Sequence, residues 1–115
     1  MAPTRELAIQ IENEFRKLAR DTHLRSLVVV GGKSAEEQGS AISRGVEVVI
    51  GSPGRIEDLV KRRYLVLNQC YYIILDEADK MIDLDLEEPV NTILESIPSN
   101  LHKSDREREV AMEEL

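Results

Sequence analysis

Short runs of aliphatic residues alternate with amphipathic segments along this chain, and that alternation restricts the fold more than any other feature. The runs are rich in Val, Ile and Leu and cover 24–30, 46–50 and 71–75. Continuous apolar runs are typical of strands that are buried on both faces. Apolar stripes at helical spacing predict helices over 5–20 and 86–97. Strands that alternate with helices predict an α/β fold with a parallel sheet flanked by helices.

Capping signals predict where two further helices begin. Ser34 and Glu37 form a capping box, in which the serine hydroxyl accepts a hydrogen bond from the Glu37 amide and the Glu37 side chain reaches back. Gly45 is a suitable end for that helix. Ser52 as the cap, with Pro53 at the first helical position, predicts the next one.

The net charge at first argues against a nucleic-acid partner, but the charge is unevenly distributed. The 115 residues carry a formal net charge of −7. Residues 1–75 hold 11 basic and 9 acidic side chains, whereas residues 76–115 hold 4 basic and 13 acidic ones. The first two thirds of the chain are therefore compatible with local binding of a polyanion.

Two other features limit the class of protein. No apolar run reaches the about 18 residues that a transmembrane helix needs, so no membrane contact is expected. Cys70 is the single cysteine and has no partner for an internal disulfide. It is expected to pack as a small buried hydrophobe in a reducing compartment.

Three turns that follow predicted strands lead into predicted helices. The turns are Pro3-Thr4-Arg5, Gly31-Gly32-Lys33-Ser34 and Gly51-Ser52-Pro53-Gly54-Arg55. In a parallel sheet they lie on one edge, where helix N-termini present unpaired NH groups to a phosphate. Their glycines allow close approach of a ligand, and each turn carries one cation. Taken singly, each turn is more simply an ordinary helix cap. Taken together, they predict sequence-independent binding of a nucleic-acid backbone.

A further strand end carries acidic residues. Asp76-Glu77-Ala78-Asp79 follows the apolar run 71–75. An acidic pair at the end of a strand is how P-loop ATPases hold Mg²⁺ and aim the attacking water. An isolated tetrad of this kind is better explained by acids at a helix N-terminus, where the helix dipole stabilises them. Its position beside three turns that suit phosphates favours the metal and water interpretation.

Together these motifs resemble the first RecA-like domain of a DEAD-box RNA helicase. The matching segments are 2–8 for an RNA-contacting element, 31–32 for a double-glycine element, 52–55 for a Thr-Pro-Gly-Arg element with serine for threonine, and 75–81 for the name-giving motif. The likeness implies a partial RecA-like parallel sheet flanked by helices over 1–97, and a charged tail or insertion, solvated or disordered, over 98–115. The run 63–70 and the tail resemble the splicing branch of the family, which implies spliceosomal protein partners and a nuclear location.

The resemblance also implies roles for individual residues. Asp76 would hold Mg²⁺ through water, Glu77 would orient or deprotonate the attacking water, and Asp79 would couple nucleotide state to the grip on RNA. ATP and Mg²⁺ are the implied cofactors, and RNA is the implied partner. The residues that would line the RNA path are Pro3, Thr4, Arg5, Gly32, Ser52, Gly54 and Arg55.

The chain also departs from the family pattern. It contains no Gly-Lys-Thr/Ser phosphate-binding loop, no glutamine-containing adenine motif, no Ser-Ala-Thr element and no second RecA-like domain, and Asp85-Leu86 stands where Gly-Phe is usual. Strands bearing the missing motifs would flank 71–75, so an exposed sheet edge is expected.

Three hypotheses remain open on this basis. One is a fragment of an ATP-dependent RNA helicase that does not hydrolyse ATP by itself. The second is a catalytically inactive truncated module that binds RNA or protein. A different P-loop motor, such as a DNA helicase, is disfavoured by the two RNA elements upstream.

Overall fold

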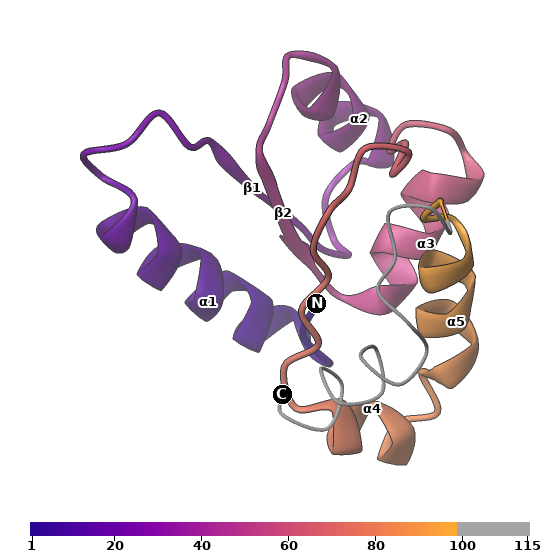
Figure 1. The fold of residues 1–115 in the computed structure, drawn as a ribbon. Coiled ribbons are helices and arrows are strands. Elements are labelled where there is room, and N and C mark those ends of the chain that lie inside the picture. The colour runs from indigo at the N-terminus through magenta and orange to yellow at the C-terminus, as the bar shows by residue number, and fades with distance from the viewer. Residues whose placement is uncertain (99–115) are drawn as a thin grey trace.

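Two parallel strands form the centre of the molecule, with helices on both sides (Figure 1). The computed structural model describes residues 1–98. Its elements in chain order are α1 (Arg5–Leu18), β1 (Ser26–Val29), α2 (Ala35–Ser43), β2 (Val48–Gly51), α3 (Pro53–Lys61), α4 (Ala78–Asp83) and α5 (Glu87–Glu95). The tail predicted over 98–115 lies, from residue 99 onward, outside the described residues. No helix within the described range is long and apolar enough to cross a membrane.

The sheet is covered on both faces, as the continuous apolar runs predicted. Strands β1 and β2 pair in parallel, with Val29 opposite Gly51. Val29 packs in one core with residues of α2, α3 and α5, whereas Val30 packs in another with residues of α1. Figure 1 shows the same layering, with α1 on one side of the strands and α2, α3 and α5 on the other. Successive side chains of a strand point to opposite faces, so two helical layers bury one aliphatic run.

Backbone hydrogen bonds extend the sheet beyond β2. The Ala2 amide donates to the Gly51 carbonyl at 3.0 Å, and the Asp76 amide donates to the Met1 carbonyl at 2.9 Å. The Met1 ammonium group donates in turn to the Ile74 carbonyl. This is the bonding pattern of parallel neighbours. Residues 1–2 therefore lie between β2 and residues 74–76, as expected for the end of a strand that precedes α1.

The prediction of a third strand over 71–75 is wrong. These residues form no assigned strand, and the side chains of Tyr72 and Ile74 are 82% and 61% exposed. Within the described range, Met1 is the residue that pairs with this segment through the backbone. A strand forms only where a neighbour completes its ladder, and here the ladder ends after one residue.

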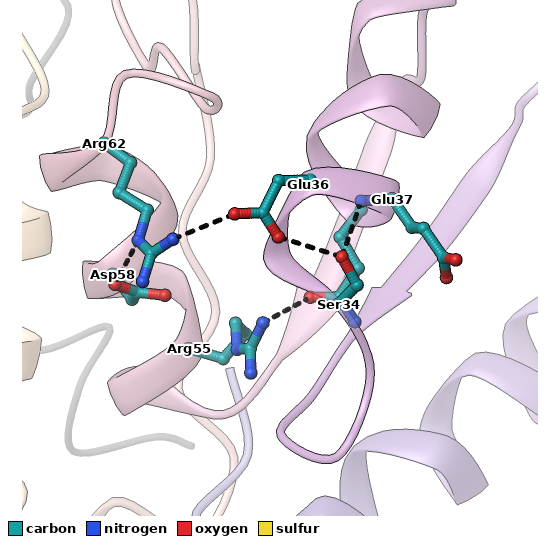
Figure 2. Close-up of polar contacts among 7 residues, drawn as sticks. Ser34, Glu36, Glu37, Arg55, Asp58 and Arg62 are labelled. Atoms are coloured by element: carbon teal, nitrogen blue, oxygen red, sulfur yellow. Dashed lines mark hydrogen bonds and ion pairs between the residues drawn. The ribbon is translucent and has the colours of Figure 1, made fainter.

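The predicted caps are largely confirmed. The Thr4 and Ser34 hydroxyls accept hydrogen bonds from the third amide of α1 and α2 respectively, each at 3.2 Å. The Ser34 capping box is half formed: the Glu37 amide donates to Ser34 Oγ, but the Glu37 carboxylate points away from Ser34 (Figure 2), and Ser34 Oγ donates instead to the Glu36 carboxylate at 2.9 Å. Gly45 follows the end of α2 with a φ of +98°, in the left-handed region that glycine tolerates. Ser52 precedes α3 without a side-chain cap.

Three details differ from the sequence-based expectation. The first helix ends at Leu18 rather than at residue 20, and the last spans Glu87–Glu95 rather than 86–97. The short helix α4 was not predicted. Cys70 is half-buried rather than buried, and its Sγ donates to the Tyr72 carbonyl at 3.3 Å.

Candidate nucleic-acid interface

The three predicted turns meet at one end of the sheet. Gly51 lies opposite Val29 at the ends of the two strands, and Ala2 bonds to Gly51. The Arg5 guanidinium group packs over Gly32, where an added Cβ would come within 2.5 Å of Arg5 Nη1. Gly32 also has a φ of +87°, so a side chain there is disfavoured twice. The first and second turns are therefore in direct contact, as a parallel sheet requires.

The third turn is tied to the second through a side chain that the sequence analysis missed. Arg55 Nη1 donates to Gln38 Oε1 at 3.4 Å. Gln38 Nε2 donates in turn to the Val30 carbonyl at 3.1 Å. Gln38 is 4% exposed on the buried face of α2. A polar residue between Ala35 and Gly39 on an inward helix face was the available signal.

The predicted RNA-path residues differ in how far they reach the surface. Arg5, Gly32 and Gly54 are exposed, whereas Thr4, Ser52 and Arg55 are half-buried and Pro3 is buried. Thr4 serves as the cap of α1, and Pro3 packs inside. The surface that a ligand meets at this end therefore consists mainly of two arginines, two glycine backbones and the N-termini of α1 and α3. Its donors and its positive charge suit phosphate groups.

A chain of exposed polar contacts connects the start of α2 to the C-terminal end of α3. Figure 2 shows Arg62 reaching from α3 to Glu36 of α2. Arg62 Nη1 and Glu36 Oε1 are 3.4 Å apart, and Arg62 Nε donates to Asp58 Oδ1 at 2.9 Å. Hydrogen bonds from its own backbone amide and from the Ser34 hydroxyl, helped by nearby arginine charges, lower the pKa of Glu36. These groups are exposed, so their contribution to stability is small.

The acidic motif lies at the same edge of the sheet, next to residues 1–2. Asp76 is half-buried, and Glu77 and Asp79 are exposed. The Met1 ammonium has a lowered pKa because it is buried, and the nearby Asp76 carboxylate partly opposes that shift. Glu77 has a φ of 53° and a ψ of 51°, a left-handed conformation that is uncommon for a residue with a side chain. Strained residues of this kind cluster at functional sites.

The metal-ligating capacity of the motif is limited. Among the described residues, no group of three or more His, Cys, Asp or Glu side chains is placed to hold a metal ion. Mg²⁺ commonly takes one or two carboxylates and completes its shell with water and substrate phosphates. A half-buried Asp76 beside an exposed Glu77 fits that kind of site. It does not fit a closed site made of protein ligands alone.

Comparison with known proteins places these features in a family. The model of the "DEAD/DEAH box helicase" family matches residues 1–112. A pre-mRNA-splicing ATP-dependent RNA helicase PRP28 of Coccidioides immitis is 52% identical over 107 residues, which cover 93% of this chain and 13% of that protein. An ATP-dependent RNA helicase ddx23 of Dictyostelium discoideum is 51% identical over 105 residues, 91% of this chain and 13% of that protein. The chain thus spans 13% of the length of these two relatives.

Solved structures show the same fold. A DEAD box protein from the hyperthermophile Methanococcus jannaschii superposes with a TM-score of 0.79 at 38% identity, over 84% of this chain and 26% of that one. The yeast DEAD-box splicing factor Prp28 superposes with a TM-score of 0.77 at 36% identity, over 84% and 24%. These likenesses confirm the predicted partial RecA-like α/β fold. With the family model matched over 1–112, the chain belongs to the DEAD/DEAH box helicase family.

Proposed function

We propose that this chain carries part of the RNA-binding and ATP-hydrolysing surface of a DEAD-box helicase that remodels RNA duplexes in pre-mRNA splicing. The observation that carries the proposal is the row of functional motifs along one sheet edge. Arg5 packs against Gly32, Arg55 is tied to the same turn, and Asp76 bonds to Met1 beside Gly51. Phosphate-binding groups and an acidic pair are thereby adjacent.

RNA meets this edge through its phosphates. Arg5 offers an exposed guanidinium group, and the N-termini of α1 and α3 add unpaired amides. Gly32 and Gly54 are exposed and have no side chain to keep a backbone away. Because none of these groups is placed to select a base edge, the contacts are independent of sequence. Pro3, Thr4 and Ser52 act by shaping the turns.

The acidic motif serves ATP hydrolysis in the parent protein. Mg²⁺, when bound with ATP, neutralises charge on the phosphates. Asp76 would hold that ion, and Glu77 would orient the attacking water. Asp79 would couple the state of the bound nucleotide to the strength of RNA binding. The 115-residue chain contains no phosphate-binding loop, so we propose that by itself it does not hydrolyse ATP and acts as an RNA- or protein-binding module.

The splicing assignment rests on the relatives. The Coccidioides protein is named a pre-mRNA-splicing helicase, and the yeast structure is that of a splicing factor. We extend that role to the parent of this chain, with a nuclear location and spliceosomal proteins as partners. We also propose that residues 1–97 form the partial helicase domain and that 98–115 form a charged extension.

The RNA-binding proposal is tested by fluorescence anisotropy with a short single-stranded RNA, without nucleotide, over a range of salt concentrations. Arg5→Ala combined with Arg55→Ala is expected to weaken binding and to reduce the salt slope by about 1.4, since each of two lost phosphate contacts on single-stranded RNA releases about 0.7 counterion. The matched control is Arg20→Ala combined with Arg44→Ala. Those two arginines are exposed at the opposite ends of α1 and α2. Equal affinity of both double variants would overturn the proposal.

The claim of inactivity is tested by phosphate release from ATP, with and without RNA. The isolated chain is expected to match the Glu77→Gln variant at background level. RNA-stimulated turnover that Glu77→Gln abolishes would show that the chain is an enzyme by itself.

A further inference from the structure

Gln38 is a buried polar side chain at the centre of the candidate interface. It projects from α2 between two buried small residues, Ala35 and Gly39. Both ends of its carboxamide are bonded: Nε2 donates to the Val30 carbonyl at 3.1 Å, and Oε1 accepts from Arg55 Nη1 at 3.4 Å. One side chain of α2 therefore links the end of the β1 run to an arginine of α3.

The burial of this amide is costly unless both of its ends are bonded. An inward helix face normally carries an apolar residue, and an unbonded amide in such a place costs about 1–3 kcal/mol. The backbone carbonyl of Val30 fixes the donor end of Gln38, and that fixes the direction of the acceptor end. The acceptor end is then aimed at Arg55.

An arginine held in this way loses less side-chain entropy when it binds a phosphate. The guanidinium group has five NH donors, and the bond to Gln38 uses one of them. Within residues 1–98 the Arg55 side chain makes no other hydrogen bond, so the remaining donors are available to a ligand. Because Val30 immediately precedes Gly31 and Gly32, the same bridge also fixes Arg55 relative to the glycine turn that Arg5 covers.

We propose that Gln38 is a positioning residue that holds the Arg55 guanidinium beside the Gly31–Gly32 turn, ready to bind an RNA phosphate. This inference rests on the proposed RNA-binding function. It assigns Gln38 no contact with RNA. Its effect on RNA affinity therefore passes through Arg55, and that dependence can be measured.

A double-mutant cycle measures it by anisotropy with the same single-stranded RNA. Gln38→Met keeps the length of the side chain and removes both hydrogen bonds. It is expected to weaken binding about threefold in the wild-type background, as for loss of one modest hydrogen bond, and to have no effect in the Arg55→Ala background. Gln10→Met, at an exposed site of α1, is the matched control and should bind like the wild type.

The outcomes separate this inference from the proposed function. Equal losses from Gln38→Met in both backgrounds would mean a general loosening of the fold, and the inference would be wrong while RNA binding stood. Full RNA affinity in Arg55→Ala would overturn the RNA-binding role of Arg55 and the inference with it.

Side-chain NMR without RNA tests the positioning directly, and the first of its two readouts needs only the wild-type chain. In the wild-type chain the carboxamide protons of Gln38 should exchange with water more slowly than those of Gln10. The Arg55 Nε–H signal should be sharp, and in Gln38→Met it should broaden. Equal exchange of the two glutamines, or an unchanged Arg55 signal in the variant, would overturn the inference.

Discussion

Replacing Gly54 with alanine should raise the stability of this chain and at the same time weaken the RNA binding that we propose for it. Gly54 is the second residue of α3 and is exposed, and a Cβ added there has no heavy atom within 4 Å. Alanine is favoured over glycine inside a helix by about 1 kcal/mol, and less near an end. The free energy of unfolding should therefore rise by about 0.5–1 kcal/mol, which corresponds to a gain of about 2–8 °C in the midpoint of thermal unfolding.

The same methyl group should weaken RNA binding. Gly54 precedes Arg55 at the N-terminus of α3, where we propose that an RNA phosphate approaches the backbone. A methyl group at that point pushes the phosphate away from the amides. Loss of one hydrogen bond to a charged group costs about 1.5 kcal/mol, so affinity should fall about tenfold. A variant that is more stable and binds RNA less tightly cannot be explained by partial unfolding.

Thermal unfolding followed by circular dichroism and RNA anisotropy measure the two effects. Gly51→Ala is the matched control for the thermal measurement, because this glycine has no room for a methyl group. A Cβ at Gly51 would overlap the carbonyl oxygen of Val29 and lie 2.6 Å from its Cγ2. Overpacking of this kind destabilises by about 1–3 kcal/mol. Wild-type RNA affinity in Gly54→Ala would refute close approach of RNA at this residue. An unchanged or lowered unfolding midpoint in Gly54→Ala would refute the argument that a methyl group fits at this position and stabilises α3.

Two other substitutions test contacts away from the interface. Hydrogen bonds from Arg25 lower the pKa of Glu47 from its ordinary value of 4.5 to about 2. The pair therefore stabilises the fold fully at pH values above 4.5, and this stabilisation is lost as the pH falls through about 2. Glu47→Gln should therefore be slightly less stable than the wild type to urea at pH 7, and most of that deficit should be gone at pH 2; an equal deficit at both would contradict this. Gly39→Ala would place a Cβ 2.7 Å from Cγ of Tyr64. It should destabilise the fold by about 1–2 kcal/mol in urea unfolding, since overpacking outweighs helix propensity. In the Tyr64→Ala background the clash is absent, so an equal loss of stability from Gly39→Ala with and without the ring would contradict the argument.

Features that depend on near neighbours in sequence could be predicted. The Thr4 and Ser34 hydroxyls each bond to an amide three residues ahead, so the sequence alone contains both partners. Gly45 ends α2 for an equally local reason. The alternation of runs also predicted a parallel sheet, because two strands that are covered by helices on both faces have few other arrangements. The placement of the three turns and the acidic motif along one edge could be predicted from that geometry, since parallel strands end at the same edge of a sheet.

Features that depend on distant partners could not be predicted. The run 71–75 has the composition of a strand, but its ladder requires neighbours that the described residues supply only at Met1. The buried Glu12 of α1 accepts a hydrogen bond from Ser26 at 2.6 Å, which only the packing of α1 on β1 makes possible. Gln38 likewise bonds to Val30 and Arg55, which come from other segments of the chain. Sequence patterns indicate which face is buried, not which polar atoms meet there.

Glu77 shows how the packing of neighbouring residues can place a candidate functional side chain. Its left-handed backbone costs about 1 kcal/mol, so its neighbours must impose that conformation. Leu75 and Met81 are both buried in one cluster, and they fix the chain on either side of the turn. The Glu77 carboxylate is exposed and lies 3.8 Å from Lys80 Nζ, an ion pair of little energetic weight. The packing of its neighbours therefore determines where the carboxylate points. Its charge can be removed with little effect on the fold, so Glu77→Gln is a suitable variant for testing the proposed role in ATP hydrolysis.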